Sequence, residues 1–534
     1  MNKQSVKRRR EEDDDDGSTI TTDRLSQLPQ PILHQILSLL SQRDAVRTCV
    51  LSKSWRYLWH GRLNFELSDD ELGFIGSKKV WSFFDKTLQR YLDQNLSLQK
   101  FLVDIRSVVV DFELLQKWIY MVIMNMGVRS LSLFFSWSTK GFTLPLVVFQ
   151  SESLVELHLQ RCNLNTLKST DNVMFNNLQT LRLHFVDISD EIFEKIISGC
   201  PLIENSFLFM CSGLNSIKLH KLRNIKNFRC VAFNKIIIEI EDPQILENFH
   251  VEKCCSDWFL RHRNTHFPHL KSLNLHRVQL PAKTFDNFSS FFPCLNELIL
   301  NFCDGLKEFR LSSSSIKCLT IRTDRINQGK RIKAFIDIPN ILYFEYSGHG
   351  FLPSVKFTPT SNEWKSKIFM WFKLEPSDND AMSWFLKLNK LLKALSQSHI
   401  TLSLAPNEYN KLHINDSYGG FYKPVVVEHL KLWGSYNYFD PAILNCFFRI
   451  FRPCYIQLDY GLARFNLVEY KSKLIPNETG CYFWLQDLEE ISTEVGNMER
   501  NEWHWVQTTS YPALSSQQRI RYRLTWKEQL SKFT

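Results

Sequence analysis

Glycine is scarce in this 534-residue chain, with 18 residues, and none of them forms a Gly-rich loop at phosphate-binding spacing. No serine is flanked as in a nucleophile elbow, and neither a His-Glu zinc helix nor a kinase signature occurs. These absences exclude the common enzyme motifs. We therefore expect a protein that is not an enzyme, with no catalytic residue and no cofactor.

Long hydrophobic runs are also missing. The most apolar stretch, residues 118–128, has eleven residues between Lys117 and Arg129, whereas a membrane-spanning helix needs ~20. No apolar leader follows the first Met, and the 13 cysteines are odd in number and irregularly spaced, a pattern typical of a reducing compartment. We expect a nuclear and/or cytoplasmic protein without a membrane partner, with the basic run Lys7 to Arg10 as a candidate nuclear-import signal.

Charge of one sign is not concentrated either. The net charge of +9 arises from 65 basic and 56 acidic residues spread along the chain, so an acidic partner is allowed but direct binding of nucleic acid is not expected. Residues 1–20 are a charged stretch that we expect to be disordered. Beyond it, 41 Phe and 14 Trp provide ample material for folded cores.

The middle of the chain repeats itself. An apolar-x-x-apolar-x-apolar pattern occurs eleven times, and one copy, at Ile203, is weak because Ser206 occupies an apolar position. Most starts lie 21 to 26 residues apart, with two steps of 11; they are Val128, Leu154, Leu178, Ile203, Leu214, Ile225, Leu246, Leu270, Leu295, Ile316 and Ile341. Each copy predicts a short strand with one buried face, and residues 187–201 and 282–295 predict helical return segments.

This pattern resembles the leucine-rich repeats of plant proteins over residues 128–351. The resemblance implies a curved, mainly parallel sheet with helical or irregular returns, hence an α/β fold. Cys162, Cys211, Cys254 and Cys303 fall three residues after the last apolar strand position, where the family has a buried Asn or Cys that supports a turn. Cys254, Cys255, His262, His266 and His269 also have a zinc-like spacing, but the turn role explains Cys254 and we expect no metal.

The repeats also predict an exposed column of side chains on the concave side, one per strand, between the last two apolar positions. Its first half is basic or aromatic, and the candidate target-binding residues are His158, Arg182, Phe207, Lys218, Arg229 and His250. Two interpretations remain open: a contact surface for an acidic or phosphorylated partner, or an ordinary solvated strand face.

Residues 21–64 predict three helices. Pro29 and Pro31 suit a helix start, Asp44 can cap a second helix, and Ser52 can cap a third that carries Trp55. So small a unit rarely stands alone, and part of its apolar surface is expected to contact a partner.

The sequence from Leu28 to His60, LPQPILHQILSLLSQRDAVRTCVLSKSWRYLWH, resembles the F-box of plant F-box proteins. The resemblance implies docking to a Skp-type adaptor and, through it, to a cullin-RING ligase. By position, the implied adaptor contacts are Leu28, Pro29, Ile32, Leu33, Ile36, Leu37, Leu51, Ser52 and Trp55. Leu33 and Leu37 are alternatively candidates for holding the three helices together.

The remaining segments are less distinctive. Residues 65–127 read as a helical linker to the repeats, and residues 352–534 as an irregular repeat-like region or a separate α/β domain. The resemblance as a whole implies the substrate-recognition subunit of an SCF-type ubiquitin ligase that holds an unknown target protein. The alternatives are a protein-binding scaffold without a ligase role and a repeat-based sensor of a small ligand.

Overall fold

The computed structural model describes most of residues 25–527. The main stretches outside the described residues are 1–24, 69–76, 106–109, 137–140, 220–223, 256–265, 281–284, 324–332, 350–352, 373–377, 407–422, 435–440, 475–482, 498–501, 507–517 and 528–534. The expected disordered segment and the basic run Lys7 to Arg10 therefore lie outside the described residues. The chain divides into two compact units, Met1–Thr139 and Lys140–Thr534.

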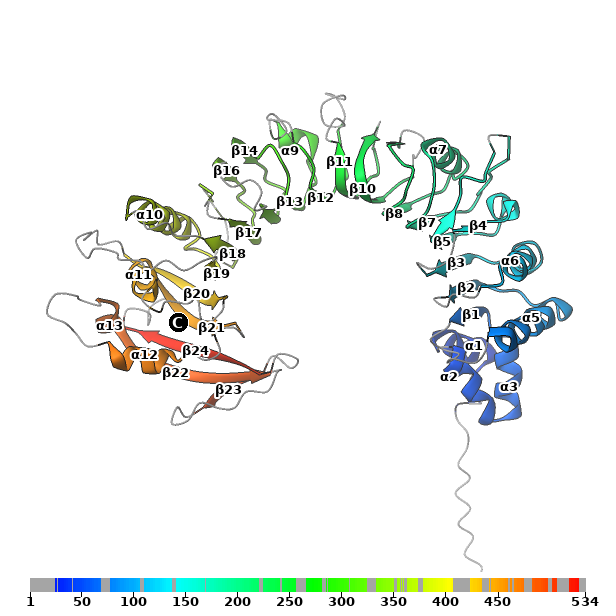
Figure 1. Cartoon of the computed structure of the whole chain (residues 1–534), viewed down its shortest axis with the longest axis horizontal. Coiled ribbons are helices and arrows are strands. Elements are labelled where there is room, and N and C mark those ends of the chain that lie inside the picture. Colours follow the sequence, from blue (N-terminus) through cyan, green and yellow to red (C-terminus); the bar gives the residue numbers. More distant parts are fainter. Residues whose placement is uncertain are drawn as a thin grey trace, which may run out of the picture. The chain divides into compact units, whose positions relative to one another are not determined.

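The first unit begins with short helices and continues with alternating strands and helices (Figure 1). Its elements are α1 (Gln30–Leu39), α2 (Gln42–Arg47), the 3-10 turn η1 (Thr48–Val50), α3 (Lys53–His60), β1 (Asn64–Ser68), α5 (Ser77–Asp93), β2 (Lys100–Ile105), α6 (Phe112–Met126) and β3 (Ser130–Phe135). The predicted helices at 80–92 and 112–127 are present as α5 and α6.

Residues 65–127 differ from the expected helical linker because they contain two strands. β1 pairs in parallel with β2, and β2 with β3, so that Asn64, Lys100 and Ser130 lie side by side. Phe65 on β1 packs against Phe101 on β2 and Phe84 on α5, with ring centroids 5.4 and 5.3 Å apart. The strand-and-return pattern thus starts two strands earlier than the sequence pattern indicates.

The second unit contains the rest of the repeats. Its elements up to residue 349 are β4 (Phe142–Thr143), η2 (Leu146–Gln150), β5 (Glu156–Gln160), β6 (Cys162–Asn163), β7 (Thr180–His184), α7 (Asp190–Ser198), β8 (Asn205–Phe209), β9 (Ser216–Lys218), β10 (Asn227–Glu239), β11 (Asn248–Cys255), β12 (Ser272–His276), α9 (Phe288–Phe291), β13 (Glu297–Asn301), β14 (Glu308–Ser312), β15 (Cys318–Arg322), β16 (Lys333–Asp337) and β17 (Tyr343–His349). Each of the eleven predicted strand segments contains a strand, and α7 confirms the helical return with Ile192, Phe193, Ile196 and Ile197 buried.

Two parallel ladders explain the irregular repeat spacing. The main ladder runs through β5, β7, β8, β10, β11, β12, β13, β15 and β17. β9 pairs instead with the distal half of β10, where Ile217 lies beside Ile238. The copy at Leu214 therefore belongs to the return half of the unit that starts at Ile203, and the two steps of 11 combine into one ordinary repeat.

A backbone turn follows many strands of the main ladder. The turn residues are non-glycine residues with φ between 51 and 60°: Arg161, Phe185, Met210, Lys253, Arg277 and Phe302. Such a residue still donates its N–H to the next strand, as Phe185 does to the carbonyl of Phe209 at 2.8 Å. The next residue is a buried Cys at 162, 211 and 303, and Cys303 Sγ donates to the carbonyl of Leu275 at 3.3 Å. The predicted turn-supporting role is confirmed at these three positions.

The strand ladder continues beyond residue 352, which fits the irregular repeat-like region, one of the two alternatives for this part of the chain. β17 pairs in parallel with β18 (Lys365–Phe372), which is followed by β19 (His399–Pro406), β20 (Val425–Leu432) and β21 (Phe451–Leu458), each parallel to the one before. The predicted amphipathic helix is α10 (Asp378–Ala394), which returns the chain between β18 and β19. The spacing is longer because of this helical return, so the repeat pattern is lost in the sequence but not in the fold.

An antiparallel sheet follows the last parallel strand. α11 (Ile443–Ile450), α12 (Leu467–Lys473) and α13 (Phe483–Asp487) accompany β22 (Leu488–Asn497), β23 (Glu502–Val506) and β24 (Gln518–Trp526). β24 pairs with β21 and with β22, and β22 pairs with β23. Within the described ranges, no helix is long and apolar enough to cross a membrane.

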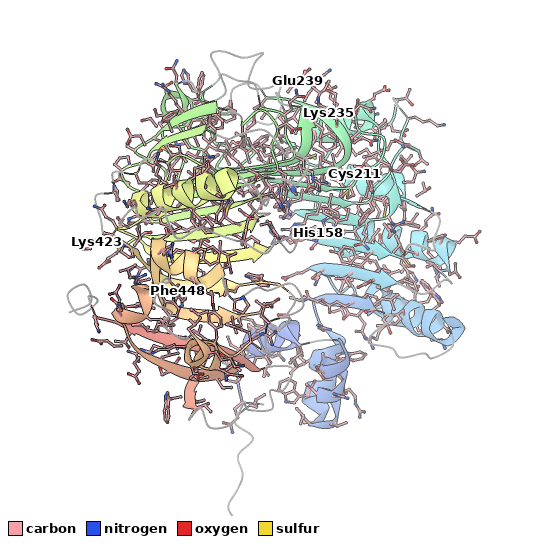
Figure 2. The ribbon with its side chains drawn as sticks, turned by 60° about the vertical axis from the view of Figure 1, so that its left-hand side comes forward. His158, Cys211, Lys235, Glu239, Lys423 and Phe448 are labelled. Atoms are coloured by element: carbon pink, nitrogen blue, oxygen red, sulfur yellow. The ribbon has the colours of Figure 1, made fainter. Side chains whose placement is uncertain are left out.

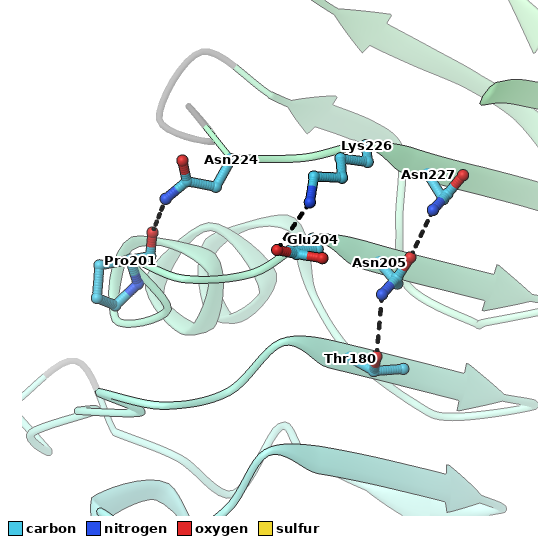
Figure 3. A network of polar contacts seen from close by, with 7 residues as sticks. All are labelled: Thr180, Pro201, Glu204, Asn205, Asn224, Lys226 and Asn227. Atoms are coloured by element: carbon cyan, nitrogen blue, oxygen red, sulfur yellow. Dashed lines mark hydrogen bonds and ion pairs between the residues drawn. The ribbon is translucent and has the colours of Figure 1, made fainter. Parts of the chain in front are cut away.

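A ladder of side-chain amides holds neighbouring strands at their N-terminal ends (Figure 3). Asn248 Nδ2 donates to Asn227 Oδ1 at 2.6 Å, and Asn227 Nδ2 donates to Asn205 Oδ1 at 2.6 Å. Asn205 Nδ2 in turn donates to Thr180 Oγ1 at 3.2 Å. Because Asn205 and Asn227 each donate and accept, the ladder links β7, β8, β10 and β11 in register.

Candidate functional site

The first candidate site is the helical segment at residues 25–60. Pro31 in the first turn and Ser52, which accepts a hydrogen bond from the Trp55 N–H at 3.3 Å, define the starts of α1 and α3. Its core is formed by Leu33, Leu37, Ala45, Trp55, Leu58 and Trp59, all of them buried. These helices thus form a small core of their own.

Three of the predicted adaptor contacts lie inside that core. Leu33, Leu37 and Trp55 are 4%, 0% and 2% exposed, because one face of α1 packs against α3. The prediction that these side chains contact a partner directly needs correction, and the alternative that Leu33 and Leu37 hold the helices together is confirmed. Ser52 is half-buried, and its hydroxyl is engaged in capping α3.

The other predicted contacts lie at the surface. Leu28, Ile32 and Leu51 are exposed apolar side chains, Pro29 is exposed, and Ile36 is half-buried. Leu28, Ile32 and Ile36 recur every four residues, which places them along one side of α1 and its entry.

Three more exposed apolar residues escaped the sequence interpretation: Leu39, Val50 and Tyr57, which are 82%, 86% and 73% exposed. The spacing of Leu39 from Ile36 and the position of Val50 beside Leu51 were the signals available. Small soluble proteins rarely expose so many large apolar side chains in one short segment unless they form an interaction surface.

The helical segment is fastened to the first strand within its own unit. Arg62 is buried, and its Nη2 donates to the carbonyl of Leu40 at 2.6 Å, while Asn64 Nδ2 donates to the carbonyl of Ser38 at 3.3 Å. The Tyr91 hydroxyl donates to the Arg62 carbonyl at 2.8 Å, and burial raises the pKa of Tyr91 to about 12. These contacts hold the end of α1 against β1 and α5.

The second candidate site is the open face of the main ladder in the second unit, on the side away from α7, α9 and α10 (Figure 1). Strand pairing places His158, Arg182, Phe207, Arg229 and His250 next to one another in that order. We call these five residues the strand-face row. His158, on β5, is labelled in Figure 2.

Lys218 does not belong to the strand-face row, which corrects the sequence prediction. It lies on β9 beside Glu239, in the second ladder, and its Nζ is 3.7 Å from a carboxylate oxygen of Glu194 on α7. The apolar pattern around Leu214 is the same as in the other copies, so the sequence alone did not distinguish the two ladders.

The row continues along the predicted column beyond the candidate target-binding residues. Strand pairing extends it through Asn274, Ile299, Thr320 and Glu345 and then to Lys367, Thr401, His429 and Tyr455. Glu345 is nearly buried and accepts hydrogen bonds from Arg322 Nη2 at 2.8 Å and from the Tyr343 hydroxyl at 2.6 Å. The single acid of the predicted column is therefore neutralised by its own neighbours.

No group of three His, Cys, Asp or Glu among the described residues has the arrangement of a metal site. The side chains of Cys254, Cys255 and His262 lie outside the described residues. The ring of His266 contacts the Ser290 carbonyl at 3.1 Å and stacks on Phe291, which gives it a packing role.

Comparison with known proteins gives two family matches along the chain. The F-box domain family matches residues 25–66. The family described as "FBD-associated F-box protein At5g56370, LRR repeats" matches residues 115–257 and 244–335. Neither matched family is a catalytic domain.

Similar proteins from Arabidopsis thaliana carry the same two features in their names. The F-box/LRR-repeat protein At3g59200 is 33% identical over 35% of this chain and 37% of its own length. The putative F-box/FBD/LRR-repeat protein At5g52460 is 29% identical over 42% of this chain and 60% of its own length. The F-box/LRR-repeat protein At3g03360 is 24% identical over 63% of this chain and 69% of its own length. The alignments with the first two cover less than two thirds of the length of those relatives.

Proposed function

This chain is a plant F-box/leucine-rich-repeat protein, and on that premise we propose that it is the substrate-recognition subunit of an SCF-type ubiquitin ligase. In this proposal the F-box docks a Skp-type adaptor, the adaptor joins it to a cullin-RING ligase, and the repeats hold a target protein. In this proposal the chain contributes binding and no catalytic residue.

The observation that carries the proposal is the distribution of apolar side chains in the F-box. Its core is complete without Leu28, Ile32, Leu39, Val50, Leu51 and Tyr57, which remain at the surface. Burying one such side chain is worth roughly 1.5–3 kcal/mol, so covering several supports a stable complex even after the cost of association is subtracted. We assign the adaptor contacts to these residues together with Pro29 and Ile36.

The buried residues have a different role in this proposal. Leu33, Leu37 and Trp55 keep α1 and α3 together and so shape the docking surface without touching the adaptor. Ser52 orients α3 through its cap. Substitution of a buried residue is therefore expected to disturb folding, whereas substitution of an exposed residue changes docking alone.

The chemistry of such a receptor is positional. Holding a target lysine near a charged ubiquitin-conjugating enzyme raises its effective concentration and converts an encounter into an intramolecular step. This requires two binding surfaces on one chain, which is the arrangement that the F-box and the strand-face row offer.

Capture of a purified Skp-type adaptor tests the proposal. The intact chain should retain the adaptor, and Ile32→Ser/Leu51→Ser should lose it. Tyr120→Ser/Met124→Ser is a matched control, because both residues are exposed apolar side chains on α6 of the same unit. Failure of the intact chain to retain any adaptor would overturn the receptor assignment.

Proximity labelling in plant cells, with and without proteasome inhibition, distinguishes a ligase receptor from a scaffold. Targets of a receptor accumulate under inhibition, whereas partners of a scaffold do not change in amount.

We also propose a nuclear or cytoplasmic location, which imaging of the tagged chain tests; a signal confined to the secretory pathway would contradict it.

A further inference from the structure

The two arginines of the strand-face row differ from several lysines near them. Lys226 Nζ lies 3.0 Å from Glu204, and Lys271 Nζ lies 2.9 Å from Glu247. Arg182 and Arg229, in contrast, have no carboxylate partner among the residues that the structure describes. The row therefore presents two positive charges that the described part of the fold does not neutralise.

Arg182 is held in place by His158 and Phe207. Its Nη1 lies 2.8 Å from His158 Nε2, and its guanidinium carbon lies 4.8 Å from the centre of the Phe207 ring. Stacking on an aromatic face and a hydrogen bond to a histidine both restrict the side chain while leaving its charge intact. Less side-chain entropy is then lost when an anion binds.

Arg229 lies on the other side of Phe207. Phe207 pairs in register with Arg182 on one side and with Arg229 on the other. Because neighbouring strands are about 4.8 Å apart, the two arginine backbones are about 10 Å apart, a gap that two guanidinium groups can close on one anion.

The histidines near the row indicate the same positive field. Burial and the charges of Arg182 and Arg229 lower the pKa of His184, which lies two residues after Arg182 on β7. Burial, Arg229 and His276 lower the pKa of His250 to about 4. At neutral pH these rings are uncharged, so the two arginines provide the charge of the row.

Farther along the same row, basic residues are paired with an acid of the fold itself. Glu345 is paired with Arg322 at 2.8 Å and lies 3.6 Å from Lys367 Nζ. There the fold brings cations and an anion together within its own ladder. Around Phe207 the described residues supply cations without a paired carboxylate, which leaves room for an anion from a partner.

We propose that Arg182 and Arg229 bind one anionic side chain of the target protein over the ring of Phe207. The chemistry fits a phosphorylated serine or threonine or an acidic residue, since guanidinium groups bind both phosphate and carboxylate through paired hydrogen bonds. This inference rests on the proposed receptor function and names the class of target segment that the repeats hold.

An array of randomised peptides tests it. Each peptide is printed with phosphoserine, aspartate or serine at the central position and probed with the intact, labelled chain. Phosphoserine and aspartate peptides should be retained above the serine peptides, and comparison of the first two identifies the source of the anion. Arg182→Ala/Arg229→Ala should weaken retention by about tenfold or more, the equivalent of losing one charge-assisted contact.

Lys218→Ala/Lys235→Ala is the matched control, because it removes the same charge from the second ladder and from the distal half of β10. It should leave retention within twofold of the intact chain. Equal retention of serine and phosphoserine peptides, or an equal loss in the control, would overturn the inference. So would tighter, Arg182-dependent binding of a short single-stranded oligonucleotide.

Adaptor capture is measured with the same proteins. Loss of peptide retention in Arg182→Ala/Arg229→Ala with adaptor capture intact supports the inference. If no anionic peptide is retained while the intact chain captures the adaptor, the inference fails and the receptor function stands. If the adaptor is not captured, the receptor function fails on its own evidence.

Discussion

Arg62 Nη2 donates a hydrogen bond of 2.6 Å to the carbonyl of Leu40, the residue that ends α1. This contact joins the F-box to the first strand of the parallel sheet through a buried side chain. The F-box helices and the start of the first strand of this unit are therefore linked directly through the side chain of Arg62.

Replacing Arg62 with alanine should loosen the F-box. The change leaves the Leu40 carbonyl without its charged donor and opens a cavity, at a cost of about 2–4 kcal/mol. Hydrogen exchange should speed up in residues 30–60 and stay unchanged in β18 to β21. Arg56→Ala, which removes an exposed arginine on α3, is the control; equal exchange in the two variants would contradict this role.

Asn227 is a second position with a defined energetic role. Asn227→Ala removes the amide hydrogen bond to Asn205 that Figure 3 shows and the one from Asn248, and should cost about 1–2 kcal/mol. Thermal unfolding followed by circular dichroism should begin at a lower temperature. In hydrogen exchange, the loss of amide protection should be concentrated in β8 to β11. Asn234→Ala, at an exposed position of β10, should lie within about 0.5 kcal/mol of the intact chain.

The environment of Glu345 predicts that the stability of the fold depends on pH. Burial disfavours its charge, but hydrogen bonds from Tyr343 and Arg322 outweigh burial and hold the pKa of the carboxyl below its ordinary value. Its contribution to stability is therefore present at neutral pH, above the pKa of the unfolded chain, and is lost as the pH falls through the lowered pKa.

The melting temperature measured from pH 7 down to the acid range tests this. The intact chain should be more stable than Glu345→Gln at pH 7, and the difference should shrink in acid. Glu152→Gln, at an exposed position, should follow the intact chain throughout. A difference between the intact chain and Glu345→Gln that stays constant with pH would show that the charge of this carboxyl does not matter.

Much of the fold follows from local pattern. Period-two alternation in LVELHL and LQTLRL requires a strand with one buried face, and Ile192, Phe193, Ile196 and Ile197 require a helix with one buried face. The turn cysteines were also predictable, because the resemblance to leucine-rich repeats implies a buried Asn or Cys at this distance after the strand.

The errors have physical reasons. α1 is apolar on more than one side, so sequence spacing did not decide that Leu33 faces the core while Ile32 faces solvent. Lys218 follows the same apolar pattern as Arg229, and only strand pairing assigns it to another ladder. β18 to β21 escaped the repeat search because long returns, including α10, separate strands that are still neighbours in space.

Co-elution with the ligase core tests the central claim most directly. The intact chain is mixed with a Skp-type adaptor and the adaptor-binding part of a cullin, and the mixture is resolved by size-exclusion chromatography. The account predicts one peak that contains all three proteins, and its loss with Ile32→Ser/Leu51→Ser. Elution of the folded intact chain apart from an adaptor–cullin complex would contradict the account.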